Sequence, residues 1–471
     1  MKSITILFIS TFFTTLSFAQ DIFDTYPKKL VLQNDSFALR WGQNGIVKYR
    51  LSSDSMNFND GALPGAYFVL FYNNDSITLP YKNNIPYGQY TYINFITPAK
   101  NSTIRLGFDQ QKSIFTQQDI LAYSNTVQFD IPEVYELANI IWALSPSGQR
   151  AKDLQKESSY YKKVLSHFKP YLDHPVFKAL DFPDSMYTIN YYDFRENSFA
   201  YQFKNKITGA GNTELLYNGP YYYVFGNENA YNSLFGQLKP LVEDFAEKSM
   251  FRKFYAANQA FYQQQIQRQQ ELLPIRQMWT WLEQQFPATS YQSYRVIFSP
   301  LIGGSHSTQN YNNYKGFAQS VMFICNTDRV DNNKALSEKV REGIMSGIVF
   351  TEIDHNYVNR ESNKYKKTID SIFSNRSTWA ATGKGSDFYG SSMNIFNEYM
   401  TWSVFCLYVL DFYRKQDADV IILERETRMV DKRNFTRFKA FNRALIQLRQ
   451  EHPTLKVVEL YPYILNWCRQ Q

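Results

Sequence analysis

The stretch Ile348-Val-Phe-Thr-Glu-Ile-Asp-His-Asn-Tyr-Val-Asn359 holds the most informative residues of this 471-residue chain. Within it, Thr351, Glu352 and His355 occupy positions i, i+1 and i+4. On a helix, positions i and i+4 lie on the same face, and position i+1 is adjacent to it. We expect a helix from Ser337 to about Val358 that brings these three side chains together.

The three positions follow the pattern of a zinc-binding helix. In metallopeptidases, such a helix places two histidines at i and i+4 as metal ligands, with a glutamate at i+1 as general base. Glu352 and His355 match the base and the second ligand, whereas Thr351 stands where the first histidine belongs.

Residues around this helix extend the pattern. A second predicted helix, about residues 393–413, supplies Glu398, and a glutamate on a following helix is the third ligand of gluzincin sites. In the loop before that helix, Tyr389 could donate a hydrogen bond to a tetrahedral oxyanion. Strands are predicted at 294–298 and 319–325, and we expect the second to be an edge strand that aligns an extended substrate.

From about residue 130 to its end, the chain resembles a bacterial family of domains of unknown function that is similar to secreted gluzincin metallopeptidases. The order of five short motifs carries the resemblance. It implies a histidine ligand at position 351, Glu352 as base, and His355 and Glu398 as ligands. The motifs are Pro132-Glu-Val-Tyr-Glu-Leu137, Asp173-His-Pro175, Ser299-Pro-Leu-Ile-Gly-Gly304, Thr351-Glu-Ile-Asp-His355 and Asn397-Glu-Tyr399.

Threonine at position 351 bears directly on zinc binding. Catalytic zinc has three protein ligands and one water, and threonine is a poor neutral ligand. With only His355 and Glu398, zinc affinity falls by orders of magnitude, and activation of a bound water becomes doubtful. The sequence leaves four outcomes open: a metal-free pseudoenzyme, Glu352 as a third ligand, His306 as a substitute ligand, or ordinary helix residues without a site.

The first 19 residues have the features of a cleaved secretory signal peptide. Lys2 precedes an apolar stretch from Ile4 to Phe13, and Ser17-Phe-Ala19 forms a small-x-small cleavage site. The absence of a nearby cysteine argues against a lipoprotein. Because no later window is apolar enough for a bilayer, we expect a secreted or periplasmic protein with no membrane span in its mature chain.

The remaining chain divides into two predicted parts, which together make an α+β fold. Residues 20–130 contain short β-favouring runs separated by turn formers, which predicts a β-sandwich-like domain. Its aromatic side chains would fill the sandwich or, alternatively, form a platform for glycans. Residues 131–471 predict a mostly helical, zincin-like domain with a small mixed sheet. Further strands are predicted at 420–423 and 456–460, and strands or loops at 187–203.

Composition excludes several other classes of protein. Aromatic residues make up 17% of the chain, which rules out a disordered protein. The 3 cysteines form no CxxC pair, so a cysteine-rich zinc module is excluded. With 50 basic and 43 acidic residues the net charge is modest, so nucleic acid is not an expected partner. We interpret one basic cluster as a solvated helix face; it consists of Arg425, Arg428, Lys432, Arg433 and Arg437.

The sequence also lacks a Gly-x-Ser-x-Gly elbow, a phosphate loop and a dinucleotide fingerprint. The prediction is therefore a secreted metallopeptidase-like protein with impaired catalysis, whose cleft binds a peptide or polypeptide. A metal-dependent hydrolase with a rearranged Glu/His/Glu site and a glycan-binding envelope protein remain the alternatives. Whether the chain is an enzyme, and whether it binds zinc, stays open.

Overall fold

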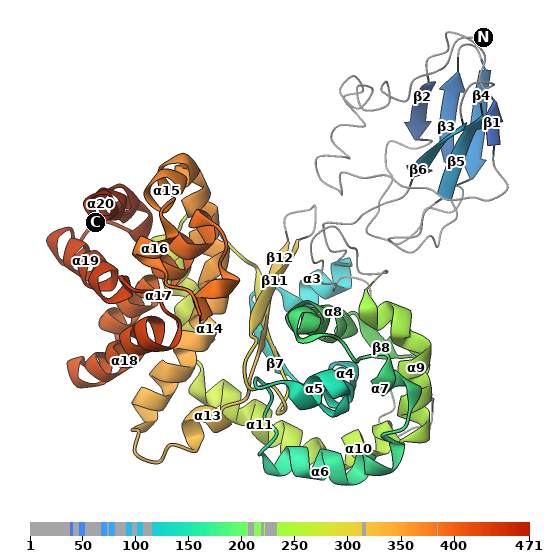
Figure 1. Cartoon of the computed structure of the whole chain (residues 1–471), viewed down its shortest axis with the longest axis horizontal. Coiled ribbons are helices and arrows are strands. Elements are labelled where there is room, and N and C mark those ends of the chain that lie inside the picture. Colours follow the sequence, from blue (N-terminus) through green and yellow to red (C-terminus); the bar gives the residue numbers. More distant parts are fainter. Residues whose placement is uncertain are drawn as a thin grey trace.

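The computed structural model describes the backbone of six strands between residues 38 and 106, followed by residues 115–205, 212–217, 221, 233–312, 317–383 and 385–471. The fold is α+β, as predicted, with many helices and a small mixed sheet (Figure 1). The predicted signal peptide and the side chains of the proposed glycan platform lie outside the described residues.

The six N-terminal strands form two three-stranded sheets. In one sheet, β1 is parallel to β5, and β5 is antiparallel to β6. In the other, β3 pairs with β2 and β4, both antiparallel. The strands are β1 (Ala38–Arg40), β2 (Val47–Leu51), β3 (Tyr67–Tyr72), β4 (Asp75–Pro80), β5 (Thr91–Ile96) and β6 (Asn101–Leu106).

A separate four-stranded sheet, in the order β11-β12-β10-β7, lies between the helices. Its inner strands β10 (Ser293–Phe298) and β12 (Ala318–Ile324) are parallel, and both are almost entirely buried. This burial explains the apolar runs Val296-Ile-Phe298 and Val321-Met-Phe-Ile324, because a strand covered on both faces does not alternate. The two predicted strands are therefore confirmed.

The prediction that the strand at 319–325 is an edge strand is wrong. β11 (Ser307–Asn312) pairs antiparallel with β12 and takes the edge position instead. Its sequence, Ser-Thr-Gln-Asn-Tyr-Asn, is polar and carries little β-strand signal. The pairing partner rather than the local sequence makes it a strand.

The other edge of this sheet is β7 (Thr126–Asp130), which is parallel to β10. Thr126 pairs with Ser293, which is far away in the sequence. β7 comes before residue 131, where the sequence predicts the second domain to begin. This sheet therefore includes residues from the end of the first predicted domain.

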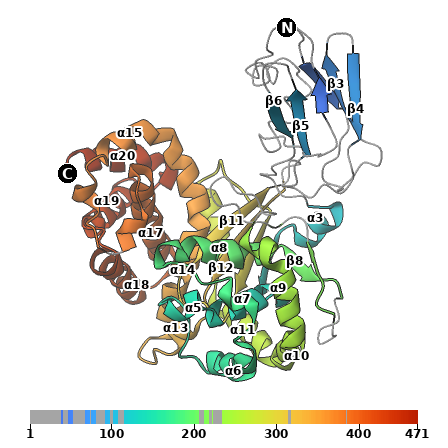
Figure 2. The same cartoon turned by 45° about the vertical axis from the view of Figure 1, so that its right-hand side comes forward.

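Two groups of helices lie on opposite sides of β11 and β12, α4–α10 on one side and α14–α20 on the other (Figures 1 and 2). Between β7 and β10 the chain contains the first group, followed by α11 and α12, which contact α14. The elements from α3 onward are α3 (Gln117–Tyr123), α4 (Glu133–Leu144), α5 (Pro146–Arg150), α6 (Ser159–Phe168), η3 (Lys169–Tyr171), α7 (Pro175–Lys178), η4 (Asp184–Met186), α8 (Tyr187–Ser198), the strands β8 (Tyr201–Phe203) and β9 (Leu215–Tyr217), α9 (Leu234–Lys248), α10 (Phe251–Ala257), α11 (Gln259–Leu272) and α12 (Ile275–Gln285).

The second group contains the two helices that the motif requires. The helix predicted from Ser337 is confirmed: Ser337 is the N-cap, and its hydroxyl accepts a hydrogen bond from the backbone N–H of Val340. The group comprises α13 (Asp328–Asp331), α14 (Glu338–Ser362), η6 (Asn363–Tyr365), α15 (Lys366–Ile372), α16 (Arg376–Trp379), η7 (Gly385–Phe388), α17 (Ser392–Phe412), α18 (Lys415–Thr427), the π-helical turn η8 (Arg428–Lys432), α19 (Phe438–Glu451) and α20 (Val457–Arg469).

Three local predictions are wrong, because helices replace the expected strands. The runs at 420–423 and 456–460 belong to α18 and α20, and most of 187–203 belongs to α8. In α18, Ile421 is buried while Val420 and Leu423 are exposed, as expected when one helix face packs against a core. Short apolar runs do not distinguish a strand from one buried helix face.

Two glycines of α14 allow α18 to pack closely against it. A Cβ atom on Gly343 would lie 2.2 Å from Cδ1 of Ile421, and one on Gly347 would lie 2.4 Å from Nη2 of Arg425. Both distances are shorter than real Cβ contacts. The missing side chains therefore make room for Ile421 and Arg425 beside α14.

Candidate functional site

The structure brings His355 and Glu398 together between α14 and α17. The imidazole Nε2 of His355 lies 3.2 Å from Oε1 of Glu398. The side chain of Glu398 is only 3% exposed, and that of His355 is 25% exposed. The two residues that the sequence predicts as metal ligands thus form a direct ion pair.

The second carboxylate oxygen of Glu398 has partners that the sequence did not predict. Nη1 of Arg433 forms an ion pair with Oε2 at 2.9 Å, and Trp402 donates a hydrogen bond from Nε1 to the same oxygen at 3.0 Å. Burial acts to raise the pKa of Glu398, but the charge of Arg433 and the bonds from His355 and Trp402 outweigh it and hold the pKa at about 2. Glu398 is therefore an ionised carboxylate with a bonded partner at each oxygen.

His355 is held in its charged form by the same carboxylate. Burial alone would lower the pKa of its imidazole. The hydrogen bond and charge of Glu398, with the nearby Asp354 and Glu352, instead raise the pKa to about 9. A protonated imidazole has no lone pair to offer a metal ion.

Thr351 lies in the predicted place of the first histidine, but its hydroxyl is already engaged. Its Oγ1 donates to the backbone carbonyls of Gly347 and Ile348, each at 3.0 Å. The residue is buried on α14. Its side chain therefore bonds to its own helix rather than to a ligand.

Glu352, the predicted general base, lines a cavity of about 160 Å³ together with Thr351 and His306. Burial raises the pKa of its carboxyl group to about 7, with the charge of Glu398 adding to the shift and those of His355 and Arg433 opposing it. At neutral pH this carboxyl group is close to half protonated. The two glutamates of the site thus differ strongly in charge.

Tyr389, the predicted oxyanion donor, also reaches this cluster. Its hydroxyl accepts a hydrogen bond from Nη2 of Arg433, and burial raises the pKa of the phenol well above its usual value. Arg433 therefore connects Tyr389 to Glu398. We call His355, Glu398, Arg433, Trp402 and Tyr389 the Glu398 cluster.

His306, the predicted substitute ligand, lines the same cavity as Thr351 and Glu352, from the loop before β11. Its Nε2 atom is buried and has no hydrogen-bond partner among the described residues. Burial, together with the charges of Arg329, Arg195 and Arg428, lowers its pKa to about 3. His306 is therefore a neutral imidazole in positively charged surroundings.

The interpretation of the basic cluster between 425 and 437 as a solvated helix face is wrong for Arg425, Arg428 and Arg433, whereas Lys432 is exposed. Arg425 is 1% exposed, and its guanidinium lies 3.8 Å from the centre of the Trp402 ring. Arg425, Arg428 and Arg433 all line the cavity beside Thr351. The density of arginines was the only sequence signal, because the contacts depend on how α18 packs on α14.

The donors at this site do not fit a catalytic zinc ion. Thr351 is bonded to its helix, His355 is paired with one oxygen of Glu398, and the other oxygen of Glu398 is paired with Arg433. Within the described ranges, no three His, Cys, Asp or Glu side chains are grouped so that they could hold a metal. The bonding of these three residues therefore does not support a reaction step through a metal ion.

Three other features of the described chain lie outside this site. Cys325 and Cys406 are buried, which raises the pKa of their thiols to about 11 and about 12, so both are poor nucleophiles. A larger hollow of about 800 Å³ lies along β7 and α12, away from every predicted site residue. No helix in the part of the chain that the structure describes is long and apolar enough to cross a membrane.

Comparison with known proteins gives no relative for this chain. No protein-family model matches it, and neither a curated protein nor a solved structure matches it. The residues of the site itself therefore carry the functional proposal.

Proposed function

We propose that this chain is a metallopeptidase-like protein without a catalytic metal, which binds a peptide or polypeptide instead of hydrolysing it. The observation that carries the proposal is the bonding of Glu398. Arg433 supplies the positive charge next to this glutamate, where an active enzyme of the family that the sequence resembles would have zinc. The secreted location predicted from residues 1–19 is part of the proposal.

The position of β11 supports peptide binding. β11 is an edge strand next to α14, and Asn310 donates a side-chain hydrogen bond to Asn356 of α14 at 2.6 Å. No strand among the described residues pairs with its outer edge. An extended peptide can add to such an edge through backbone hydrogen bonds.

A hydrolase with Glu352, His355 and Glu398 as ligands is the competing proposal. The 3.2 Å between His355 and Glu398 is compatible with it, because two ligands bonded to one tetrahedral zinc at about 2 Å lie roughly 3.3 Å apart. The distance therefore does not decide between the two proposals. The guanidinium of Arg433 favours the metal-free one, since a cation beside Glu398 opposes the binding of a second cation.

Metal analysis of the full chain, purified without chelators, tests the metal-free state. We expect far less than one zinc per chain in the native protein and in Thr351→His. The double variant Thr351→His/Arg433→Ala should take up more zinc, because it restores a ligand and removes the competing charge. Stoichiometric zinc in the native protein that is lost in His355→Ala would overturn the proposal.

Hydrogen exchange tests peptide binding at β11. A mixture of unstructured peptides that binds along the outer edge should slow exchange of the amides at 307–312. Exchange within β10, which is internal, provides the control and should not change. Binding peptides that protect only other segments would rule out this edge as the binding site.

A further inference from the structure

The cavity beside Thr351 contains more positive charge than its surroundings neutralise. Four guanidinium groups line it, and they come from three different parts of the fold. We call this cavity the arginine pocket; its wall includes Arg329, Arg425, Arg428, Arg433, His306 and Trp402.

Carboxylates compensate for only part of this charge. Arg433 pairs with Glu398 at 2.9 Å, and Arg428 donates to Glu424 at 2.8 Å. Arg425 reaches the same Glu424 only at 3.7 Å, so two guanidiniums share one carboxylate. Arg329 has no hydrogen bond or ion pair with any described residue. Glu352 also lines the pocket, and Glu398 pairs with His355 as well as with Arg433. Counted together, five cationic side chains face three carboxylates, which leaves an excess of about two positive charges.

Arg425 is the most unusual of the four. Its side chain is 2% exposed, and its Nε atom is buried without a hydrogen-bond partner among the described residues. Burial and the neighbouring positive charges lower the pKa of this guanidinium to about 9. A buried cation without full pairing is costly, and an anion in the pocket would remove that cost.

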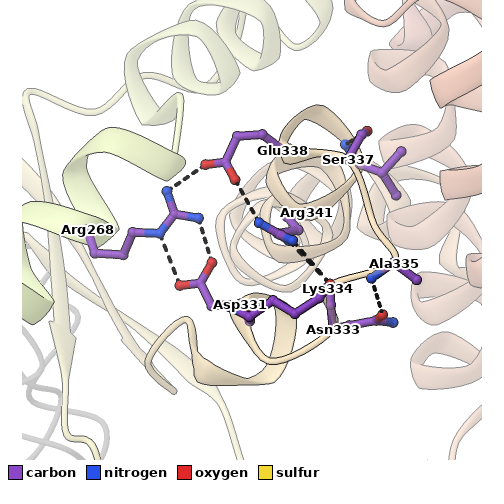
Figure 3. Close-up of polar contacts among 9 residues, drawn as sticks. Arg268, Asp331, Asn333, Lys334, Ala335, Ser337, Glu338 and Arg341 are labelled. Atoms are coloured by element: carbon purple, nitrogen blue, oxygen red, sulfur yellow. Dashed lines mark hydrogen bonds and ion pairs between the residues drawn. The ribbon is translucent and has the colours of Figure 1, made fainter.

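Arg329 completes the pocket from the side of α13, and an ion-pair network fixes this short helix. Arg268 of α11 forms two hydrogen bonds to Asp331, at 3.0 Å and 2.5 Å, and one to Glu338 at 2.6 Å (Figure 3). Asp331 is in the same helical turn as Arg329. The network therefore holds the backbone that carries the exposed Arg329 at the rim of the pocket.

The size and chemistry of the pocket indicate its ligand. About 160 Å³ holds roughly five waters, which suits one small anionic group rather than a drug-sized ligand. Guanidinium groups match the oxygens of phosphate in paired hydrogen bonds. The neutral His306, whose Nε2 is unpartnered among the described residues, adds a further polar group at the wall.

We propose that the arginine pocket binds a phosphate-type dianion, either inorganic phosphate or the phosphate group of a phosphomonoester. The charge excess favours a dianion over a single carboxylate. The proposal does not rest on peptide binding at β11, because it uses only the cavity and its arginines. Phosphate binding is also measured without peptide or metal, so the two proposals can fail separately.

Calorimetric titration of the full chain with inorganic phosphate, at constant ionic strength, tests this proposal. We expect saturable binding that weakens by roughly tenfold or more in Arg329→Met, because one charged hydrogen-bonding group is lost. Arg329 is exposed at the rim, so this variant should fold. Arg425→Met is the second variant, with circular dichroism to verify its fold, and should weaken binding at least as much.

Lys415→Met is the matched control. Lys415 is on α18 like Arg425, but its side chain is 88% exposed and pairs with Asp419. Loss of its charge should leave phosphate affinity unchanged. Phosphoserine in place of phosphate separates the two sources: tighter binding identifies a monoester site, and weaker binding a site for the free ion.

Three results would overturn the proposal. The first is no saturable phosphate binding at millimolar concentrations. The second is an equal loss of affinity in Arg329→Met and Lys415→Met, which would indicate a general charge effect. The third is acetate binding as tightly as phosphate, which would indicate a carboxylate site.

Discussion

The Glu398 cluster and the arginine pocket are neighbours that share Arg433 and Trp402, yet their charges are balanced differently. In the cluster, each oxygen of Glu398 has a bonded donor, and the carboxylate is almost fully buried. In the pocket, Arg425 and Arg428 share Glu424, and Arg329 has no ionic partner in the described part of the chain.

This difference separates a structural role from a binding role. A buried ion pair that is satisfied by protein groups needs no ligand, and removing one partner is costly. Cations without partners are stabilised only when something else supplies negative charge. The cluster is therefore expected to matter for folding, and the pocket for binding.

The largest loss of stability is expected when Arg433 is removed from the Glu398 cluster. Arg433→Met leaves Glu398 buried with one fewer cation, which should lower the free energy of unfolding by about 3–5 kcal/mol. Urea unfolding measures this. In the exposed control Lys415→Met, the change should stay within about 0.5 kcal/mol. A loss below about 1 kcal/mol in Arg433→Met, on the order of a surface pair, would contradict a structural role for the cluster.

A smaller effect is expected from the pH dependence of the ion pair between His355 and Glu398. The pKa of His355 is raised from its usual 6.5 to about 9, so its stabilising contribution is complete below pH 6.5 and is lost as the pH rises toward 9. The gap in unfolding free energy between the native protein and His355→Gln should therefore narrow by about 1–3 kcal/mol between pH 6 and pH 9.

Taking this difference removes from the comparison the titrations of groups that do not interact with His355. Burial raises the pKa of Glu136 to about 8, so this group also makes the native protein less stable as the pH rises. Glu136 is present in both proteins, and its contribution cancels. A gap that stays constant with pH would show that His355 does not titrate with Glu398.

The smallest loss of stability is expected when the ion pairs that hold α13, the helix of Arg329, are removed. Arg268→Met removes the partly exposed pairs with Asp331 and Glu338 and should cost about 0.5–1 kcal/mol of stability. Phosphate affinity should fall a few-fold, because α13 is held less firmly. Lys339→Met, at an exposed pair on α14, is the control and should leave phosphate affinity unchanged. Equal phosphate affinity in both variants would show that the ion pairs of Arg268 do not contribute to phosphate binding in the arginine pocket.

The sequence predicted those parts of the fold that have a long, continuous pattern of apolar residues. α14 and α17 have extended helical patterns, and the resemblance to gluzincin sites pointed to His355 and Glu398, which lie 3.2 Å apart. α18 was mistaken for a strand, because its short apolar run resembles one. β11 was missed, because its polar residues become a strand only by pairing with β12.

For the same reason, only some residues of the site could be predicted from the sequence. Glu352 and His355 follow a spacing that can be recognised within one helix, and the resemblance to gluzincins implies Glu398 on a following helix. Arg433 and Arg425 reach the site because α18 packs against the two glycines of α14. The sequence contains no local pattern that indicates this packing. The positive charge of Arg433 beside Glu398 was therefore not predicted.

The parallel pairing of β7 with β10 has a consequence for how the chain folds. Thr126 and Ser293 are neighbours in the sheet, but all helices from α4 to α12 lie between them in the sequence. Such distant strand pairing forms slowly, because the chain loses the entropy of a long loop before the contacts form. During synthesis, β7 therefore has no pairing partner until β10 has been made, and a chain truncated before residue 293 should lack the four-stranded sheet.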